Sequence, residues 1–541
     1  MLTRFNKFNL AYVILFLFIA TYGFILIVSA NFGVIDDHVL LSTIAIGKDM
    51  PLFIIPDIGR FFPLDGYEWS LISNISVSPI LFYTYNAIQV FIIAYLILSI
   101  LENIFNYDNK YLSVYIILFL LFLPGFVTAW LRLFVPERSE LFFLIIFLYF
   151  FLKYQKEQKI FYLLVGLTSA NIALYYKEPA FLMLGSFAFL HLIFGWKEIN
   201  FKQKIFDFLL MISSFIFILV YFFVVYLNKG ETLYGTTTLN QFLQMAKNIF
   251  NMALSDPLII FILLPLVLYR LYQIIKIRKI DYLFDSMLFS SAIYVLVYIK
   301  LNMFAHHYLL PSYAFGLIAI SYFIFKEQFY KKVLFKILGI ITLIFVLFSS
   351  LPTGLHFMSH YKNVPNNFQN TLSFLHDYVS ENSKNGKKVS IFLDGVNRNG
   401  GEVHHSFIKY LEFKGLKHNQ FDIKSDENDN GILPIKVENS EALYTIIKKA
   451  TSSEIKSGDL VIVTPYTTKY IGLDKNEINK MSENYKLIYH AKSFLEIPNI
   501  GIKSIIKAIY RENKNDSSEN EIMVSQNVFQ MPLDFYVFKA R

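Results

Sequence analysis

Four short polar clusters interrupt an otherwise apolar chain, and their residue types are those of a site that combines acid–base chemistry with anion binding. In chain order they are Asp36-Asp37-His38, Pro136-Glu137-Arg138, Lys177-Glu178-Pro179 and His306-His307-Tyr308. A carboxylate can act as a general base, and Lys or Arg can bind a phosphate. Ionisable groups at a membrane face cost solvation energy unless they are paired or line a wet cavity. Clusters that converge on one face therefore predict the site of an integral membrane enzyme.

The acidic pair Asp36-Asp37 is the candidate for catalysis. It lies just beyond the first apolar segment, in a long polar loop that runs from Asn31 to about Ile80. A positioned Asp can remove a proton from an acceptor hydroxyl. The alternative is that one of the two caps a short helix beginning at His38, because Asp is a favoured N-cap residue. We expect at least one of them to have a catalytic or metal-linked role.

Basic residues in the same set of loops predict a binding site for an anionic lipid-linked group. The candidate cations are Arg60, Arg132, Arg138 and Lys177. Arg binds phosphate with two parallel hydrogen bonds, whereas Lys acts as a compact point charge. The structural alternative pairs Glu137 or Glu178 with these cations in salt bridges, or lets Lys177 extend to the interface. It is the expected position of all of them on one face that favours a binding site.

The two adjacent histidines do not share a helix face, so a metal pair made of His306 and His307 is not expected. A metal site would need one of them together with Asp36 or Asp37. We expect one His to hydrogen-bond phosphate or sugar and the other to face the headgroup region. No cofactor is assigned, and a divalent metal stays open. The predicted substrate-binding residues are His38, Arg60, Arg132, Glu137, Arg138, Lys177, Glu178, His306, His307 and Tyr308.

The elements that must position these residues are membrane helices. Of 541 residues, 55% are hydrophobic and 18% aromatic, which is more aromatic than a soluble domain. Segments near the length of about 20 residues that crosses a bilayer predict about eleven transmembrane helices, the fourth to sixth of them short. They are Leu10–Ala30, Leu81–Ile104, Leu112–Leu131, Leu141–Leu152, Ile160–Leu174, Ala180–Phe194, Ile205–Leu227, Leu258–Ile275, Ser286–Ile299, Leu309–Phe325 and Val333–Ser350.

Lysines and arginines alternate between the loops and predict the orientation. Arg4 and Lys7 precede the first helix, and the even-numbered loops are rich in basic residues, whereas the opposite loops are poor in them. By the positive-inside rule the chain after Ser350 lies outside the cytoplasm. This bias explains much of the net charge of +8, and no basic stripe typical of nucleic-acid binding is present. The first apolar run is read as a retained helix rather than a signal peptide.

The composition becomes polar after Leu351, which predicts two domains: a transmembrane domain of residues 1–351 and an extracytoplasmic α/β domain of residues 352–541. Short apolar runs predict strands at Val389–Leu393, Leu460–Thr464, Lys486–His490 and Phe535–Phe538. Amphipathic stretches predict helices at Phe368–Val379, His404–Phe413 and Lys475–Tyr485. The chain has no cysteine, which excludes a disulfide scaffold and a thiol nucleophile.

The order of these motifs resembles the GT-C class of membrane glycosyltransferases, in the branch of protein O-mannosyltransferases and the lipid A aminoarabinose transferase. The resemblance is carried by the acidic pair, by Lys177-Glu178-Pro179 and by His307-Tyr308-Leu309-Leu310-Pro311, and it covers about Met1 to Ser350. It implies a polyprenyl-phosphate sugar donor, Asp36 or Asp37 as general base, and Lys177 as a phosphate contact. Relatives commonly carry Lys-Gly-Pro and Arg-Tyr at the two later motifs, where this chain has Glu178 and His307.

The expected activity is therefore transfer of a sugar, with inversion, to a glycan, lipid or protein of the cell envelope at the outer face of a bacterial inner membrane. A ligase or polymerase of surface polysaccharide is the alternative among enzymes. An oligosaccharyltransferase is less expected, because the Trp-Trp-Asp-Tyr-Gly signature is absent. A transporter or flippase of lipid-linked sugar is the alternative from another class, and discontinuous helices near the bilayer midplane would favour it.

Overall fold

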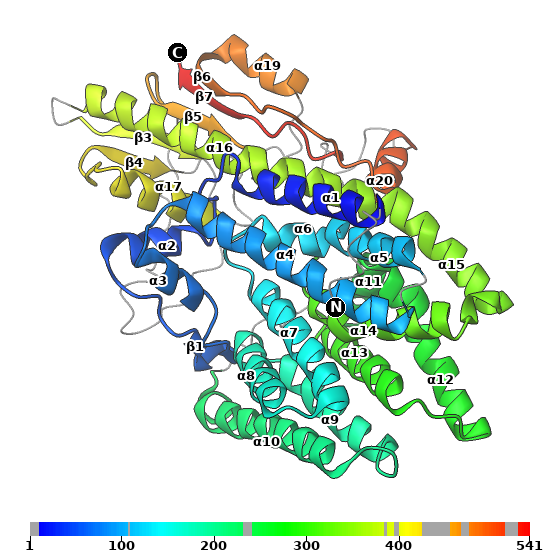
Figure 1. Cartoon of the computed structure of the whole chain (residues 1–541). Coiled ribbons are helices and arrows are strands. Elements are labelled where there is room, and N and C mark those ends of the chain that lie inside the picture. The colour runs from blue at the N-terminus through cyan, green and yellow to red at the C-terminus, as the bar shows by residue number, and fades with distance from the viewer. Residues whose placement is uncertain are drawn as a thin grey trace.

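The computed structural model of the chain describes residues 10–106, 109–230, 241–383, 387–393, 400–424, 455–466, 475–513 and 528–541. A bundle of helices makes up the first two thirds of the chain, and a sheet domain follows it (Figure 1). Arg4 and Lys7, on which part of the orientation argument depends, lie outside the described residues.

Every apolar segment predicted from the sequence is helical. The helices of the bundle are α1 (Leu10–Ile27), α4 (Pro79–Ile104), α5 (Lys110–Phe122), α6 (Pro124–Trp130), α7 (Pro136–Glu157), α8 (Ile160–Tyr176), α9 (Ala180–Phe194), α10 (Phe201–Val224), α11 (Gln241–Ser255), α12 (Leu264–Ile277), α13 (Tyr282–Lys300), α14 (Tyr313–Ser321) and α15 (Val333–Phe345). Single wider π turns precede α12 (η5, Ile259–Leu263), follow α14 (η7, Tyr322–Lys326) and follow α15 (η9, Val346–Ser350).

Helix length and composition identify a membrane protein. Within the described ranges, six helical segments are long and apolar enough to cross a bilayer: Leu10–Ile27, Pro79–Ile104, Phe201–Asn228, Ile259–Ile277, Tyr282–Lys300 and Val333–Asn382. α5 and α6, which meet at a 65° bend, would form a seventh if they are one broken span. α8, α9 and Leu310–Lys326 are apolar but shorter, and α7 carries charges in its first turns. The count of about eleven spans therefore stays a prediction.

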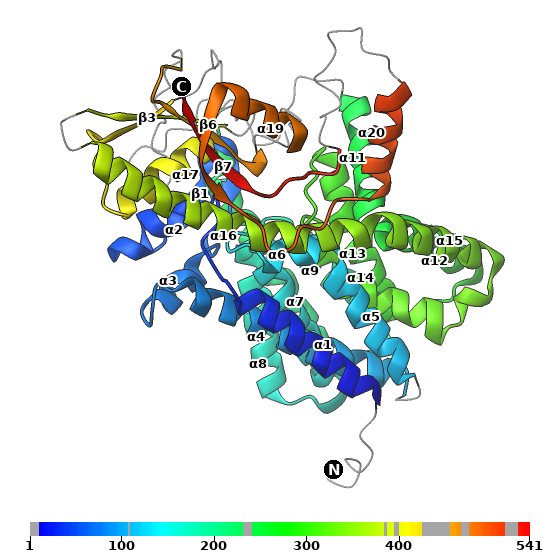
Figure 2. The same ribbon diagram turned by 90° about the horizontal axis from the view of Figure 1, so that it is seen from above.

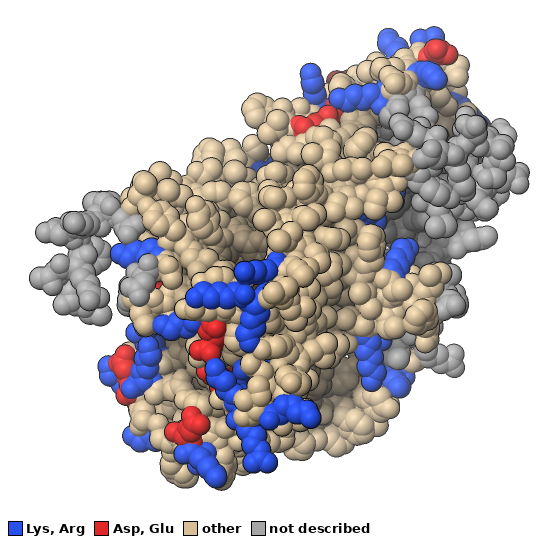
Figure 3. Space-filling view, turned by 90° about the vertical axis from the view of Figure 1, so that its right-hand side faces the viewer, with Lys and Arg blue, Asp and Glu red and all other residues tan. Residues whose placement is uncertain are grey.

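Basic side chains gather at one end of the bundle. Figure 3 looks onto the side where α12 ends and α15 begins, and lysines and arginines outnumber acidic residues on that face. Lys156, Lys276 and Lys326 lie in the last turns of α7, α12 and η7. This asymmetry agrees with the predicted orientation, in which such loops face the cytoplasm.

The first long loop folds into short elements against the opposite end of the bundle. They are α2 (His38–Ser42), η2 (Ile44–Ile46), β1 (Ile54–Ile55), η3 (Pro56–Ile58), β2 (Arg60–Phe61) and α3 (Tyr67–Ser73). β1 and β2 pair antiparallel across a turn closed by Gly59, whose positive φ of 75° suits glycine. On α3, Trp69 is buried while Tyr67 and Leu71 are exposed, which is the pattern of an interfacial helix.

The sheet domain is joined to the bundle without a break. α16 (Leu351–Asn382) continues α15 and η9 as one helix across the predicted boundary at Leu351. In the described part of this domain five strands form one sheet, in the order β4-β3-β5-β7-β6, with β3 parallel to both neighbours and β7 antiparallel to β5 and β6. Their bounds are β3 (Val389–Leu393), β4 (Phe421–Lys424), β5 (Leu460–Val463), β6 (Tyr485–Ala491) and β7 (Phe535–Ala540).

The predicted α/β character of this domain is thus present, with α17 (Gly400–Phe413), α19 (Lys475–Asn484) and α20 (Ile502–Asn513) as its further helices. β4 and α20 were not predicted from the sequence. Figures 1 and 2 show α16 running along the sheet and back to the membrane helices.

Contacts from α17 hold the first loop in place. The Tyr410 hydroxyl donates to the carbonyl of Gly33 at 2.8 Å, and the amide of Ile35 donates to Ser406 Oγ at 2.9 Å. One apolar core is shared by the loop, α16, α17 and the sheet. The C-terminal domain therefore fixes the backbone that carries Asp36 and Asp37.

Candidate active site

Asp36 has a strained backbone and an accessible, charge-paired side chain. Its φ is +41° and that of Ile35 is +67°, an unusual conformation for residues other than glycine and one that is found preferentially at functional sites. The carboxylate forms an ion pair with the guanidinium of Arg132, which lies between α6 and α7. The side chains of Asp36 and Arg132 stay 39% and 30% exposed, so a substrate can reach this carboxylate.

Asp37 has a different environment one residue later. Its side chain is buried, and Oδ2 accepts a hydrogen bond from the amide of Gly33 at 2.6 Å. Burial raises the pKa of this carboxyl to about 7. Helix α2 begins at His38 and has Asp37 at its N-cap, as the structural alternative predicted, but the Asp37 side chain makes no capping hydrogen bond. Its polar role is to close the turn that begins at Gly33.

Lys177 lies in the short connection between α8 and α9. Its ammonium is 2.9 Å from Glu137 Oε1, in the first turn of α7, and both side chains are buried. The ammonium also lies 5.4 Å from the ring centre of Tyr308 and 5.7 Å from that of Phe62. These rings add cation–π attraction to the ion pair. The ion pair and the two rings therefore fix the position of the Lys177 ammonium, which does not extend freely to the interface.

His307 lies beside the Lys177–Glu137 pair and within electrostatic range of the Asp36–Arg132 pair. Its Nε2 is 3.9 Å from Glu137 Oε2. Burial lowers its pKa to about 4, and the charges of Glu137, Arg132, Lys177 and Asp36 all act on it as well. His307 is therefore neutral at pH 7 and can donate one hydrogen bond and accept another. Its buried Nδ1 has no hydrogen-bond partner among the described residues.

These five side chains form what we call the central cluster: Asp36, Arg132, Glu137, Lys177 and His307. They come from four loops that are far apart in the sequence. The sequence predicted this convergence, since all four loops were expected on one face of the bundle.

Arg60 extends the cluster on the side of Lys177. Its Nε is 3.0 Å from Glu178 Oε1, which also accepts the amide of Phe61 at 2.8 Å. The Arg60 guanidinium lies 4.5 Å from the ring centre of Phe62, the ring that Lys177 also approaches. Arg60 and Lys177 are thus two cations beside one aromatic ring.

Arg138 is turned away from the central cluster. It is buried and pairs with Glu68 Oε1 at 2.7 Å, while its other nitrogen donates to the carbonyls of Arg132 and Leu133. Glu68 also accepts hydrogen bonds from Ser139 and Tyr176 at 3.0 Å. Salt bridging was the structural alternative for the cations, and here it occurs with an acid that the sequence analysis did not single out. The sequence feature that could have identified Glu68 as a partner for a cation is its position beside Trp69 on a predicted interfacial helix.

The other predicted binding residues face different neighbours. His38 Nδ1 is 3.0 Å from Ser406 Oγ and its ring meets His405, so it faces α17 rather than the central cluster. His306 Nδ1 is 3.1 Å from Ser255 Oγ, and its ring packs on Phe357. The two adjacent histidines therefore have separate surroundings, as the sequence predicted. Tyr308 stacks on Tyr298, with 5.0 Å between the ring centres.

Further carboxyl groups surround Lys177 and Arg138 and were not predicted. Asp65 is buried, and burial, followed by the charge of Glu68, raises its pKa well above the usual range. Glu140, one turn after Glu137, accepts a hydrogen bond from Tyr294 at 3.1 Å. Within the described part of the chain no group of three His, Asp or Glu is arranged to hold a metal ion.

An open cavity of about 380 Å³ lies where the first loop meets α8. It is lined by Leu64, Leu167, Thr168, Asn171, Ile172 and Tyr175. The amide of Leu64 donates to the carbonyl of Tyr175 at 3.2 Å, two residues before Lys177. The cavity therefore lies beside the last turn of α8, and one of its lining residues, Tyr175, is two residues before Lys177.

No protein-family model matches the chain, and no curated protein matches it. Among solved structures, the chain is similar to the crystal structure of the Archaeoglobus fulgidus oligosaccharyltransferase in complex with Zn and sulfate. The TM-score is 0.42 and the identity 12%, over 97% of this chain and 88% of that one.

Proposed function

We propose that the chain is a membrane glycosyltransferase of the GT-C type. It transfers a sugar from a polyprenyl phosphate or diphosphate to a hydroxyl of a glycan, lipid or protein at the outer face of the bacterial inner membrane. The observation that carries this proposal is the central cluster, in which the accessible Asp36 carboxylate is paired with Arg132, and a neutral histidine, His307, lies beside the Lys177–Glu137 pair and within electrostatic range of Asp36. A base and an anion site side by side are what an inverting transfer from a phosphate leaving group needs.

Asp36 is the general base in this proposal. Its carboxylate is accessible, and the Arg132 guanidinium holds its orientation. It takes the proton of the acceptor hydroxyl as the oxygen attacks the anomeric carbon from the face opposite the phosphate. The bond between that carbon and the phosphate oxygen breaks as the new glycosidic bond forms, so the configuration inverts. Asp37 supports the turn and does not touch substrate, because it is buried and bonded to Gly33.

Lys177 and Arg60 hold the leaving phosphate. The two cations flank the Phe62 ring, and their carboxylate partners, Glu137 and Glu178, keep them in place before the donor arrives. The donor phosphate shares these cations, which stabilises the negative charge that grows as the glycosidic bond breaks. His307 offers a neutral hydrogen-bonding group to the same phosphate or to the sugar. The cavity beside α8 accepts the first isoprene units, since it is largely apolar and open.

The test is binding of a radiolabelled polyprenyl phosphate to the purified full chain in nanodiscs at fixed salt. We expect saturable binding that Lys177→Ala weakens at least tenfold. Lys159→Ala is the matched control, because Lys159 is a lysine with a carboxylate partner that lies exposed at the other end of the bundle. Mass spectrometry of lipids that purify with the chain then identifies the sugar. Equal donor affinity in wild type and Lys177→Ala would show that Lys177 does not bind the donor phosphate, and the assignment of the donor site would be wrong.

One observation favours a second candidate, transport of a lipid-linked sugar. α5 and α6 are broken by 65° at Pro124, and transporters place substrate at such discontinuous helices. α6 is buried within the protein, with Phe126 stacked on Trp130 at 3.9 Å. Proteoliposomes containing a fluorescent lipid-linked sugar separate the two functions. Movement of the label between leaflets without acceptor favours the transporter, whereas its transfer to an acceptor favours the enzyme.

A further inference from the structure

Helix α20 has an apolar face that is exposed to the surroundings of the sheet domain. Its isoleucines follow the spacing i, i+3, i+4 and i+7, which places them on one side: Ile502, Ile505, Ile506 and Ile509. The side chains of Ile505, Ile506 and Ile509 are 43%, 52% and 55% exposed. Single exposed apolar residues are common, but a contiguous stripe on one helix marks an interaction surface.

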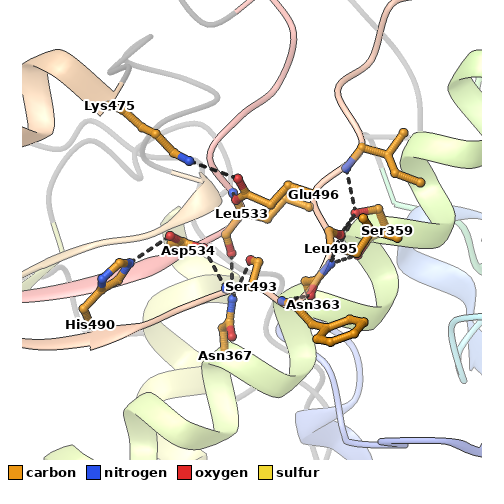
Figure 4. Close-up of polar contacts among 12 residues, drawn as sticks. Ser359, Asn363, Asn367, Lys475, His490, Ser493, Leu495, Glu496, Leu533 and Asp534 are labelled. Carbon is orange, nitrogen blue, oxygen red and sulfur yellow. Dashed lines mark hydrogen bonds and ion pairs between the residues drawn. The ribbon is translucent and has the colours of Figure 1, made fainter.

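The segment before α20 is fixed to α16, so the stripe has a defined position. We call residues 493–497 the strap. The side-chain amide of Asn363 makes two hydrogen bonds with the backbone of the strap (Figure 4). It accepts one from the amide of Phe494 at 3.0 Å and donates one to the carbonyl of Leu495 at 2.7 Å. Ser359 bonds the same carbonyl and the amide of Ile497.

The strap is also held from its other side. Asn367 donates to Ser493 Oγ at 2.9 Å, and the amide of Ser493 donates to Asp534, which is paired with His490 (Figure 4). These bonds tie the strap to α16, β6 and the segment before β7. α20 therefore starts from a rigid attachment.

This attachment places α20 against the last membrane helix. α20 contacts η9, and so does α11, and Figure 2 shows α11 and α20 lying side by side. Lys503 of α20 donates to Asn251 of α11 at 2.9 Å. The apolar residues Leu347 and Phe348 of η9 are 48% and 58% exposed, and those of α15 continue them as the surface of a candidate membrane span. α20 thus contacts a candidate membrane span whose surface beside it is exposed and apolar.

α11 carries apolar residues on its exposed side too. Phe242, Leu243 and Phe250 are 74%, 69% and 46% exposed. The pair of helices therefore presents more apolar surface to the surroundings than the stripe alone.

Two lysines lie at the contact between the helices. Lys507 lies one turn after Lys503 on α20, and Lys247 lies one turn before Asn251 on α11, so the Lys503–Asn251 bond brings these two turns to the same contact. Burial, followed by the charge of Lys247, lowers the pKa of Lys507. No carboxylate is paired with either lysine among the side chains that the structure describes. Two adjacent cations beside an apolar face are the arrangement by which amphipathic helices bind anionic lipid headgroups.

We propose that α11 and α20 form a monotopic membrane contact in the outer leaflet, and that anionic phospholipid is the partner of this surface. The isoleucines of α20 and the exposed phenylalanines of α11 enter the boundary between headgroups and acyl chains. Lys247 and Lys507 meet lipid phosphates. The C-terminal domain is then held to the bilayer at a second place, besides its continuous link through α16. This inference does not depend on the glycosyltransferase proposal.

The absence of cysteine makes the test direct. Ile506→Cys, at a position that is 52% exposed, is compared in the full chain with two exposed reference positions: Ile340→Cys, 60% exposed on α15, and Asp377→Cys, whose native side chain is 77% exposed on α16. Each is reconstituted in nanodiscs that hold one copy of the chain. We expect Ile506→Cys to react with a membrane-impermeant maleimide at least tenfold more slowly than Asp377→Cys. A bimane label there should be quenched by nitroxides on lipid headgroups and upper acyl chains, and the Ile340 label by deeper nitroxides.

Reaction of Ile506→Cys at the rate of Asp377→Cys, without quenching, would overturn the proposal. Protection in multi-copy proteoliposomes that disappears in single-copy nanodiscs would show that a second chain covers the stripe, and would overturn it as well. The charge is tested with Lys247→Glu/Lys507→Glu, for which we expect severalfold weaker quenching in phosphatidylglycerol and little change in phosphatidylcholine. Lys417→Glu, on the exposed surface of the sheet domain, is the control and should leave the quenching unchanged.

Discussion

The neighbouring residues Asp36 and Asp37 allow one chemical change to be made in two environments. In Asp36→Asn the amide keeps the shape of the carboxylate, and Asn tolerates the left-handed backbone at φ +41° as well as Asp does. What is lost is the ion pair with Arg132, between side chains that are 39% and 30% exposed. We expect transfer to fall sharply while the protein stays folded.

The magnitudes separate the two effects. A partly exposed ion pair contributes about 0–1 kcal/mol to stability. Loss of a general base lowers the rate by about 10²–10⁴, and each factor of ten corresponds to about 1.4 kcal/mol in the barrier. The expected rise of the transfer barrier, about 3–6 kcal/mol by these figures, is therefore several times larger than the loss of stability. Asp37→Asn should leave turnover within a fewfold of wild type, because that buried carboxyl bonds only Gly33 among the described contacts.

The assay is single-turnover transfer from a radiolabelled donor in nanodiscs, with donor affinity and thermal midpoint measured on the same samples. Near-wild-type turnover in Asp36→Asn would refute the assignment of the base. Loss of turnover in Asp37→Asn alone would move the base to the buried carboxyl. Equal loss of turnover and of thermal midpoint in both variants would mean that the pair is structural.

Three more outcomes follow from the same contacts. Because the folded-state pKa of Asp37 is raised to about 7 from 3.8, the folded chain binds the extra proton and stability falls as pH rises between these values; thermal midpoints from pH 5 to 8 should fall less in Asp37→Asn than in wild type. Lys177→Ala leaves the buried Glu137 unpaired and should cost about 3–5 kcal/mol in unfolding free energy, which added Glu137→Gln restores without restoring donor affinity. A reporter that is active only in the cytoplasm, fused after Arg541, should be silent, and strong activity would mean an even number of spans.

The helices were predictable because a bilayer demands long apolar runs, and every run that the sequence offered is helical. Strands β3, β5 and β7 were predictable for a similar reason, as short buried apolar stretches. β6 was predictable from its run of Leu487, Ile488 and Tyr489, although most of this strand is not buried. β4 was missed because Asp422 and Lys424 alternate with its two buried residues in a polar region. The continuous helix through Leu351 was missed because the change in composition indicates a boundary, whereas backbone hydrogen bonding does not depend on composition.

The meeting of the four loops was predictable from the number of spans and the basic loops. Salt bridges of Glu137 or Glu178 with the cations were the structural alternative, and both carboxylates do pair with cations, Glu137 with Lys177 and Glu178 with Arg60. Sequence offers no measure of which carboxylate faces which cation, and Glu68 rather than Glu137 neutralises Arg138. The side chain of Asp36 is accessible and that of Asp37 is buried because of the turn at Gly33. Contacts from α17 hold this turn in place. Such contacts join residues more than 300 positions apart, and local patterns do not encode them.

The unbroken helix from Val333 to Asn382 makes the sheet domain a lever on the bilayer. Its 50 residues correspond to about 75 Å at a rise of about 1.5 Å per residue. Pro365 lies within it without ending it. A force that rotates the outer domain relative to the membrane is therefore transmitted along this continuous helix to α15. We expect this helix to bend most easily at η9, because a π turn replaces the regular i→i+4 backbone hydrogen bonds with i→i+5 bonds. α11 and α20 contact the helix at η9, and we expect these contacts to limit the bending.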